Sequence, residues 1–126
     1  WPIDAQGVAF GGYGAWMLPR DMARFGYLYL KDGQWEDEQI VPAEWVDISQ
    51  QKHMERKYIA DNYYGYHWWV SHNDYYSAVG YGGQWIIVVP ERELVVVFTN
   101  TFVEGDHLQW STPERLLTTY ILPAID

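Results

Sequence analysis

The residues best suited to chemistry follow a predicted strand in the second half of the chain, at residues 78–84, AVGYGGQ. Glycines directly after a strand allow a ligand or another backbone to approach closely, and they leave backbone N–H groups available. On an edge strand, such N–H groups could stabilise the oxyanion that forms when a carbonyl is attacked. A β-bulge and a tight turn that serve packing alone explain the same glycines. On spacing alone, both interpretations stay open.

A formal Ser-x-x-Lys pattern at Ser49 and Lys52 matches the nucleophile motif of one class of serine hydrolases. That mechanism requires the serine at the start of a helix, with the lysine one turn later to activate the hydroxyl. Ser49 lies instead at the end of a predicted amphipathic helix, before a polar segment. We therefore interpret this pattern as a solvated helix end.

The other polar clusters predict no cofactor and no metal site. The 4 histidines lack the i, i+4 spacing of metal ligands, and the chain has no cysteine. His67 alternates with Tyr66 and Trp68, so we interpret it as a hydrogen-bonded strand residue. The glycine runs lack the lysine and Ser/Thr of a phosphate-binding loop. The clustered carboxylates lie in predicted turns and are interpreted as solvated: Glu36, Asp37, Glu38, Glu91 and Glu93.

Aromatic residues suggest a second class of function. The chain has 8 Trp and 11 Tyr, and flat rings can stack on sugars. A non-catalytic binding or interaction domain, for example a carbohydrate-binding one, is therefore the alternative hypothesis. Most of the rings lie at apolar-periodic positions, among them Trp45, Trp69 and Trp85, where core packing also explains them.

Composition excludes several other classes. The 126 residues suffice for one domain with a core, and 48% of them are hydrophobic. A formal net charge of −9 disfavours nucleic acid as a partner, because no basic stripe offsets it. No run approaches the ~20 apolar residues that a membrane span needs. Trp1 follows no leader pattern, so we expect a longer parent protein, whose compartment this sequence does not specify.

Two helices are predicted in the first half of the chain. Pro19 suits a first helical position, and Gly33 ends this helix. Pro42, followed by Glu44, begins a second helix that continues to about residue 50. The glycine-rich segment before residue 18 is predicted to be irregular and held against other structure.

A third helix is predicted at the C-terminus. Ser111 and Glu114 fit a capping box, and Pro123 is expected to stop the helix. Its predicted buried stripe consists of Leu116, Leu117, Tyr120 and Ile121.

Strands are predicted between these helices, one at residues 64–71 and three within residues 75–100. Residues 84–89 and 94–99 are apolar at almost every position, whereas a strand with one wet face should alternate, so both faces must be covered. The predicted fold class is α/β of the α+β type, an antiparallel sheet of about four strands with helices packed on it. Residues 1–126 are expected to form one segment of a single domain.

Four segments occur in a specific order: PRDMARFGYLYLKDGQW, IVPAEWV, YGYHWW and AVGYGGQWIIVVPERELVVVFTN. In this order they resemble the C-terminal part of the class C β-lactamase-like serine hydrolases. That superfamily includes β-lactamases, DD-peptidases, family VIII esterases and 6-aminohexanoate-dimer hydrolases. The resemblance spans nearly the whole chain, and it implies that the Ser-x-x-Lys and Tyr motifs lie N-terminal to this region.

The third family motif, Lys/His-Thr-Gly on an active-site edge strand, is matched best by Ala78, Val79 and Gly80. Gly80 keeps the glycine, whereas Ala78 replaces the cationic or imidazole side chain and Val79 replaces the hydroxyl. The resemblance therefore implies an esterase, an amidase or another hydrolase more than the recognition of a β-lactam carboxylate. It also implies that the Tyr81 backbone N–H is one oxyanion-hole donor, a role that tolerates a change of side chain.

We further expect Tyr75, Tyr76 and Gln84 to line the substrate pocket of a parent domain that binds a small ester or amide. Without the nucleophile, this chain alone is expected to be catalytically silent. A segment of a larger sheet exposes an apolar face and an unpaired edge. We therefore expect it to pair with the missing N-terminal half of the domain or to self-associate.

Overall fold

The computed structural model describes residues 1–55, 63–101, 103–105 and 108–125. Within these residues, the main feature is a six-stranded antiparallel sheet whose strands follow one another in chain order. Its strands are β3 (Met54–Glu55), β4 (Tyr63–Tyr64), β5 (Trp69–Val70), β6 (Tyr76–Val79), β7 (Trp85–Val89) and β8 (Leu94–Phe98). A separate ribbon pairs β1 (Gln34–Trp35) with β2 (Glu38–Gln39). The predicted fold class is confirmed, with six described strands where about four are predicted.

Of the two extra strands, one is β3, and the other arises where a single strand was predicted, at residues 64–71. There β4 pairs with β5 as a tight hairpin. His67 lies in the turn between them with a φ of +65°, and its side chain is exposed. Histidine is one of the few non-glycine residues enriched at positive φ, which permits a reversal inside an aromatic run. The prediction that His67 is a strand residue is therefore wrong.

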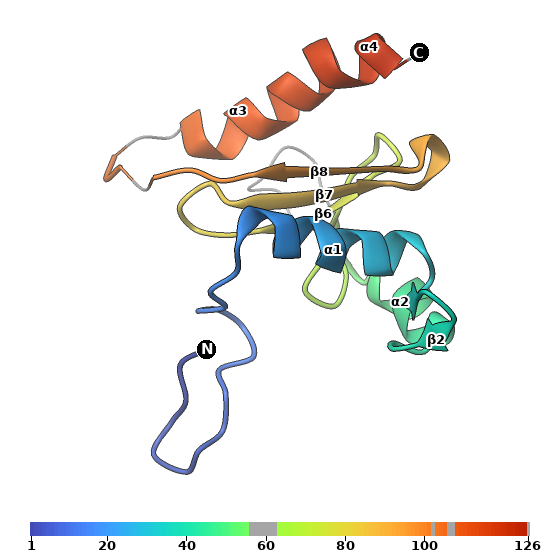
Figure 1. The fold of residues 1–126 in the computed structure, drawn as a ribbon. Helices are drawn as coiled ribbons and strands as arrows, with labels where there is room; N and C mark the ends of the chain where they lie inside the picture. The colour runs from blue at the N-terminus through green and yellow to red at the C-terminus, as the bar shows by residue number, and fades with distance from the viewer. Residues whose placement is uncertain (56–62, 102, 106–107, 126) are drawn as a thin grey trace.

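The first predicted helix is confirmed as α1 (Pro19–Leu30), with its proline in the first turn. It packs against β7 and β8 (Figure 1). A Cβ added to Gly26 would lie 2.6 Å from Val95 Cγ1 and 2.8 Å from Ile86 Cγ2. Glycine at this position therefore allows the helix backbone to approach two strands at once.

The second predicted helix is confirmed as α2 (Ala43–Ser49). Its Val46 is fully buried and joins α1 and the sheet in one core cluster. The buried members of this first core cluster are Tyr29, Val46, Trp68, Tyr76 and Val88. The two N-terminal helices thus cover one face of the sheet, as the apolar strands require.

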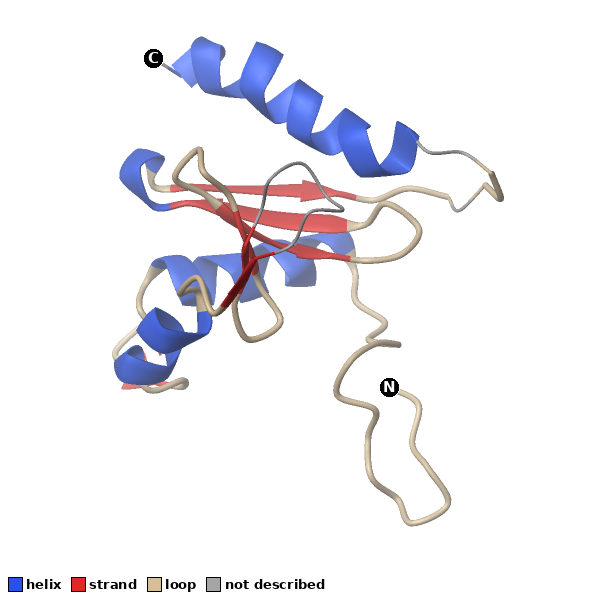
Figure 2. Cartoon of the chain, turned by 180° about the vertical axis from the view of Figure 1, so that it is seen from behind, coloured by secondary structure: helices blue, strands red, loops and turns tan. Residues whose placement is uncertain are grey.

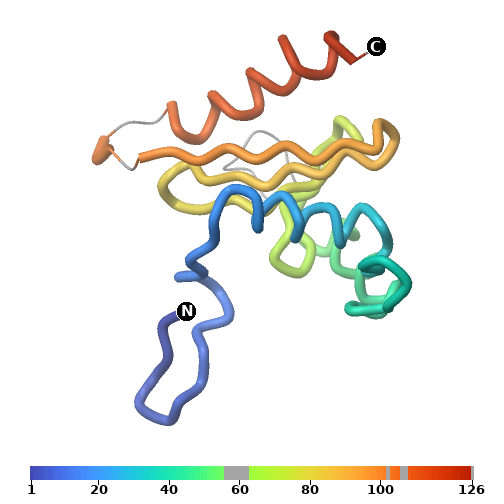
Figure 3. The backbone as a smooth tube through the Cα atoms, viewed as in Figure 1, coloured from blue at the N-terminus to red at the C-terminus, as the bar shows by residue number. Residues whose placement is uncertain are grey.

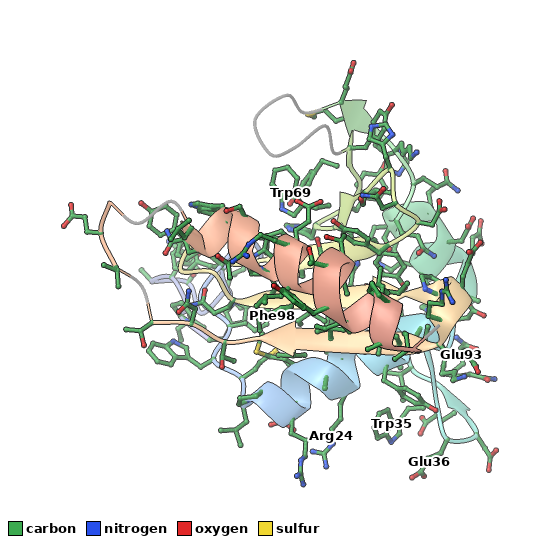
Figure 4. All side chains as sticks on the ribbon, turned by 90° about the horizontal axis from the view of Figure 1, so that it is seen from above. Arg24, Trp35, Glu36, Trp69, Glu93 and Phe98 are labelled. Atoms are coloured by element: carbon green, nitrogen blue, oxygen red, sulfur yellow. The ribbon has the colours of Figure 1, made fainter. Side chains whose placement is uncertain are left out.

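The opposite face is covered by the C-terminal helical segment, which consists of α3 (Leu108–Leu116), the π-helical turn η2 (Leu117–Ile121) and α4 (Leu122–Ile125). Figure 2 shows the sheet between this segment and the other helices. Viewed from above, α3 crosses the sheet near Phe98 (Figure 4). The buried members of this second core cluster are Tyr75, Trp85, Ile87, Val89 and Leu117.

The C-terminal helix differs in detail from its prediction. It includes residues from Leu108 onward, so Ser111 lies inside it instead of capping it, and Pro123 lies within α4. Leu117 is fully buried, but Tyr120 is 60% exposed. The π-helical turn adds a residue to one turn and shifts the register, which moves Tyr120 out of the predicted stripe.

Residues 1–18 extend away from the sheet and its helices (Figure 3). They are irregular, as predicted, apart from a bridge between Ile3 and Ala9. The prediction that they are held against other structure is wrong, since Trp16 is 90% exposed. None of the helices in the described part of the chain is long and apolar enough to cross a membrane.

Candidate active site

The turn between β6 and β7 is a short hairpin loop. Val79 and Trp85 form the last ladder pair before it, and the Gly80 N–H donates to the Gln84 carbonyl oxygen at 2.7 Å. The Gly83 N–H donates to the Gly80 carbonyl oxygen at 3.0 Å, which closes a β-turn. Gly83 itself has a φ of +80°, as in hairpins where a glycine bulge follows the turn. The glycines therefore build a bulged turn, and its chemistry depends on the groups it presents.

Tyr81 lies at the tip of this turn. Its side chain is 74% exposed and meets the Trp110 ring of α3 edge-on, with 5.9 Å between the ring centroids. The Gly80 carbonyl points into the turn, toward Gly83. Because the Gly80–Tyr81 peptide is planar and trans, the Tyr81 N–H points the opposite way, out of the turn. The turn thus directs a main-chain donor outward, at an exposed residue.

In the described part of the chain, the sheet has an open edge immediately before the turn. Strand β6 pairs with β5 at Tyr76 and Ser77 and with β7 along its whole length. Among the described residues, Ala78 and Val79 pair with β7 alone. Both side chains are half-buried, Ala78 against the first core cluster and Val79 against the second. The three residues that match the third motif therefore lie on an edge, with Gly80 at its end.

The two predicted pocket tyrosines lie in the core. Tyr75 is 2% exposed and donates its hydroxyl to Glu114 Oε1 of α3 at 2.7 Å. Tyr76 is 4% exposed and meets Trp68 edge-on. Burial raises the pKa of both hydroxyls, and the hydrogen bond to Glu114 raises that of Tyr75 further. Their packing inside this chain accounts for both residues, and substrate contact by them stays a prediction.

Gln84 is bound into the turn by both ends of its side chain. Its Oε1 accepts the Gly82 N–H at 3.1 Å, and its Nε2 donates to the Asn100 carbonyl oxygen at 3.3 Å. These bonds link the turn to the segment that follows β8. The structure therefore brings Gln84 together with Gly80 and Tyr81. Its side chain hydrogen-bonds to other groups of the protein there.

The interpretation of the Ser-x-x-Lys pattern as a solvated helix end is wrong for Ser49, which lies in the core, whereas Lys52 is exposed. Ser49 is fully buried, and its Oγ donates to the Val46 carbonyl oxygen at 2.9 Å. Lys52 Nζ lies over the Tyr63 ring, 4.7 Å from its centroid. The buried hydroxyl supports our rejection of Ser49 as a nucleophile. In the described ranges, no group of three or more His, Cys, Asp and Glu side chains could hold a metal ion.

Three residues near the turn escaped the sequence analysis. Trp110 contacts the Tyr81 ring, Asn100 accepts from Gln84, and a Cβ on Gly83 would lie 2.9 Å from Gln109 Cβ. Gln109 Oε1 is buried and has no hydrogen-bond partner in the described part of the chain. All three lie 16–29 residues from Tyr81 or Gln84 in sequence order, and no local spacing pattern connects them to the turn.

The family model described as Beta-lactamase matches residues 1–117. A solved structure of a putative 6-aminohexanoate-dimer hydrolase from Bacillus anthracis is 27% identical, with a TM-score of 0.59. The match covers 83% of this chain and 29% of that protein. Among curated proteins, nothing matches.

Proposed function

Since the chain belongs to the beta-lactamase family, we propose that it is the C-terminal portion of a serine hydrolase domain that cleaves an ester, amide or β-lactam bond. The chain corresponds to 29% of the length of the matched hydrolase, so most of such a domain lies outside it. The buried state of Ser49 supports a nucleophile located in that remainder. This chain alone is then catalytically silent.

The reaction we propose proceeds through an acyl-enzyme. The serine oxygen of the remaining domain attacks the substrate carbonyl carbon, and the carbonyl oxygen becomes a negatively charged oxyanion. The bond to the leaving group then breaks, the leaving group takes a proton, and water later releases the acyl group from the serine. The Tyr81 backbone N–H is one donor to the oxyanion, with the nucleophile's own N–H as the second.

The observation that carries this proposal is the turn at the open end of β6. It supports the role of Gly80 and Tyr81, because the turn hydrogen bond directs the Tyr81 N–H outward at an exposed residue. Ala78 and Val79 have no polar side-chain group that could bind a substrate carboxylate. Their composition favours an ester or amide substrate over a β-lactam in the proposed domain.

The rest of the domain is also the partner that we propose for the outer edge of the sheet. Strand β8 is apolar at all 5 positions and half-buried along its length. Among the described residues it pairs with β7 alone, which makes it an edge strand. Edge strands of stable proteins are usually short, charged or covered, and β8 has none of these protections within the strand. Self-association of the isolated chain through this edge is the alternative outcome.

A fluorophosphonate probe, which labels activated serines, tests the proposed function. The protein encoded by the complete reading frame should be labelled at a serine outside residues 1–126, and this chain alone should not. Hydrolysis of a p-nitrophenyl ester should follow the same pattern. Labelling of Ser49, or a reading frame that encodes only these residues, would contradict the proposal.

The carbohydrate-binding alternative has one supporting observation, an exposed aromatic group. Trp45 and Tyr66 are 47% and 45% exposed, and they stack on each other with 5.5 Å between centroids. His53 stacks on Tyr66 as well, at 4.3 Å. These ring faces already cover one another, which weakens the alternative. A shift of tryptophan fluorescence on addition of oligosaccharides would favour it.

A further inference from the structure

In the turn that presents Tyr81, a hydrogen bond holds each of the two peptide planes that flank this residue. The plane between Gly80 and Tyr81 is fixed by the hydrogen bond from Gly83 N–H to the Gly80 carbonyl oxygen, at 3.0 Å. The plane between Tyr81 and Gly82 is fixed by the hydrogen bond from Gly82 N–H to Gln84 Oε1, at 3.1 Å. Since each peptide plane is rigid, these two bonds restrict both backbone dihedrals of Tyr81.

The Gln84 side chain is itself anchored outside the turn. Its Nε2 donates to the Asn100 carbonyl oxygen, which follows β8 in the chain. At the base of the turn, the Gln84 carbonyl oxygen accepts the Gly80 N–H at 2.7 Å. One residue therefore contacts the turn at its base and at its tip, and ties the tip to a neighbouring segment.

We propose that Gln84 is a positioning residue of the oxyanion hole, whose side chain holds the Tyr81–Gly82 peptide plane and so stabilises the turn that directs the Tyr81 N–H. This inference rests on the proposed function and adds a second residue to it. Oxyanion donors are effective because they are aligned before the charge develops, so a loose turn would lose rate without losing substrate affinity. Gln84 acts through the backbone of Gly82 and does not contact the substrate.

The amide side chain suits this role because it both accepts and donates. It must accept from an N–H and donate to a carbonyl, and a carboxylate or a lysine supplies only one of these functions. A Gln84→Glu variant keeps an acceptor for Gly82 and loses the donor to Asn100. A Gln84→Ala variant loses both. Comparison of these two variants therefore separates the contribution of the acceptor from that of the donor.

Gln39 provides a matched control. Its Nε2 donates to the carbonyl oxygens of Asp32 at 2.7 Å and Val41 at 2.6 Å, so it also braces a backbone turn. This turn lies between α1 and α2 in the chain and is not part of the β6–β7 turn. A Gln39→Ala variant should lower the melting temperature, because it also loses side-chain hydrogen bonds to the backbone. It should leave catalysis unchanged.

The test uses the protein encoded by the complete reading frame, with a p-nitrophenyl ester as substrate and a fluorophosphonate as probe. Gln84→Ala should lower kcat about 10- to 100-fold, up to the loss seen on removal of one oxyanion donor, with KM changed less than about 3-fold. Gln84→Glu should fall between Gln84→Ala and wild type. In the 126-residue chain, the Gly82 amide should exchange hydrogen faster in Gln84→Ala than in Gln39→Ala.

The outcomes separate this inference from the function on which it rests. If the wild-type protein is not labelled by the fluorophosphonate, the proposed function fails. If it is labelled and Gln84→Ala reacts equally fast, the positioning role fails while the function stands. A large rise in KM at constant kcat would overturn the positioning role in favour of direct substrate contact. Unchanged exchange at Gly82 would also overturn it.

Discussion

The two ends of strand β6 differ in burial and in strand pairing, although they are only a few residues apart. At its start, Tyr75 and Tyr76 are buried, and the strand has partners on both sides. At its end, Ala78 and Val79 pair with β7 alone among the described residues, and Tyr81 is exposed in the turn beyond them. The stability of the start depends on the side chains that it buries, whereas the proposed function of the end depends on its backbone conformation.

This difference indicates how the fold could support a site built from main-chain groups. The buried start packs between two helical layers, and the turn lies at the other end of the strand (Figure 1). A main-chain donor needs such support, because no side-chain rotamer can correct its direction. Substitutions should therefore act on stability at the start of β6 and on turn geometry at its end.

The largest effect is expected from Tyr76→Ala. The side chain is 4% exposed and packs edge-on against Trp68, so truncation leaves a cavity in the first core cluster. We expect a loss of about 3–5 kcal/mol in the free energy of unfolding, measured by urea titration. Tyr81→Ala is the matched control and should cost less than about 1 kcal/mol, because that ring is 74% exposed. Equal losses would contradict the distinction between the two ends.

Gly83→Ala should have the next largest effect. Its φ of +80° costs an L-residue roughly 1–2 kcal/mol, and the new Cβ would also lie 2.9 Å from Gln109 Cβ. Gly105→Ala separates these causes, since Gly105 has a φ of +81° and no atom of the described residues lies within 4 Å of its added Cβ. Urea titration should show the larger loss for Gly83→Ala. If the two variants lose the same free energy of unfolding, the contact between the added Cβ and Gln109 contributes nothing.

Tyr75→Phe should cost about 1–2 kcal/mol at neutral pH, because Glu114 loses its hydroxyl donor. The pKa of the Tyr75 hydroxyl is raised in the fold above its ordinary value of 10.0, so the fold favours the neutral form. This stabilisation is complete below pH 10 and is lost as the pH rises further, because the unfolded chain releases the proton first. Urea titrations from pH 9 to 12 should show a shallower decline for Tyr75→Phe than for wild type. Parallel declines would contradict the role of Tyr75.

Much of the fold could be predicted because its signals are local. Pro19 and Pro42 mark helix starts, and the apolar hairpin of β7 and β8 requires cover on both faces. The failures depend on non-local or subtle geometry. A reversal at His67 needs a positive φ within an aromatic run, and a π-helical turn moves Tyr120 to the surface. Neither feature changes hydrophobic periodicity enough to be recognised.

The candidate site was only partly predictable for a similar reason. The glycines around Tyr81 indicated a turn, and family resemblance suggested what it presents. The hydrogen bond from Gln84 to Asn100 joins residues that are 16 apart in the chain and are brought together by the pairing of β7 and β8. The direction of the Tyr75 side chain is a further example, because its hydroxyl donates to Glu114 of α3. Such contacts are set by tertiary packing, and spacing in the sequence does not reveal them.

The smallest effect is expected at a surface ion pair on the β7–β8 turn, which lies at the opposite end of β7 from the Tyr81 turn. Lys31 Nζ lies 2.9 Å from Glu93 Oε1, joining the end of α1 to the β7–β8 turn (Figure 4 labels Glu93). Their attraction raises the pKa of Lys31 and lowers that of Glu93. Its contribution should be lost as the pH falls through the lowered pKa of Glu93, or rises through the raised pKa of Lys31.

Glu93→Gln should therefore change the melting temperature at pH 7 very little, since both groups are exposed to solvent and salt screens them. Calorimetry at low and high salt measures the difference, which should shrink further at high salt. Glutamine keeps the shape and the backbone conformation of residue 93, so charge is the only change. A loss as large as that of Gly83→Ala would mean that the far end of the hairpin is as tightly constrained as the Tyr81 turn. The contrast between a rigid, geometry-dependent turn at one end of β7 and a tolerant one at the other would then fail.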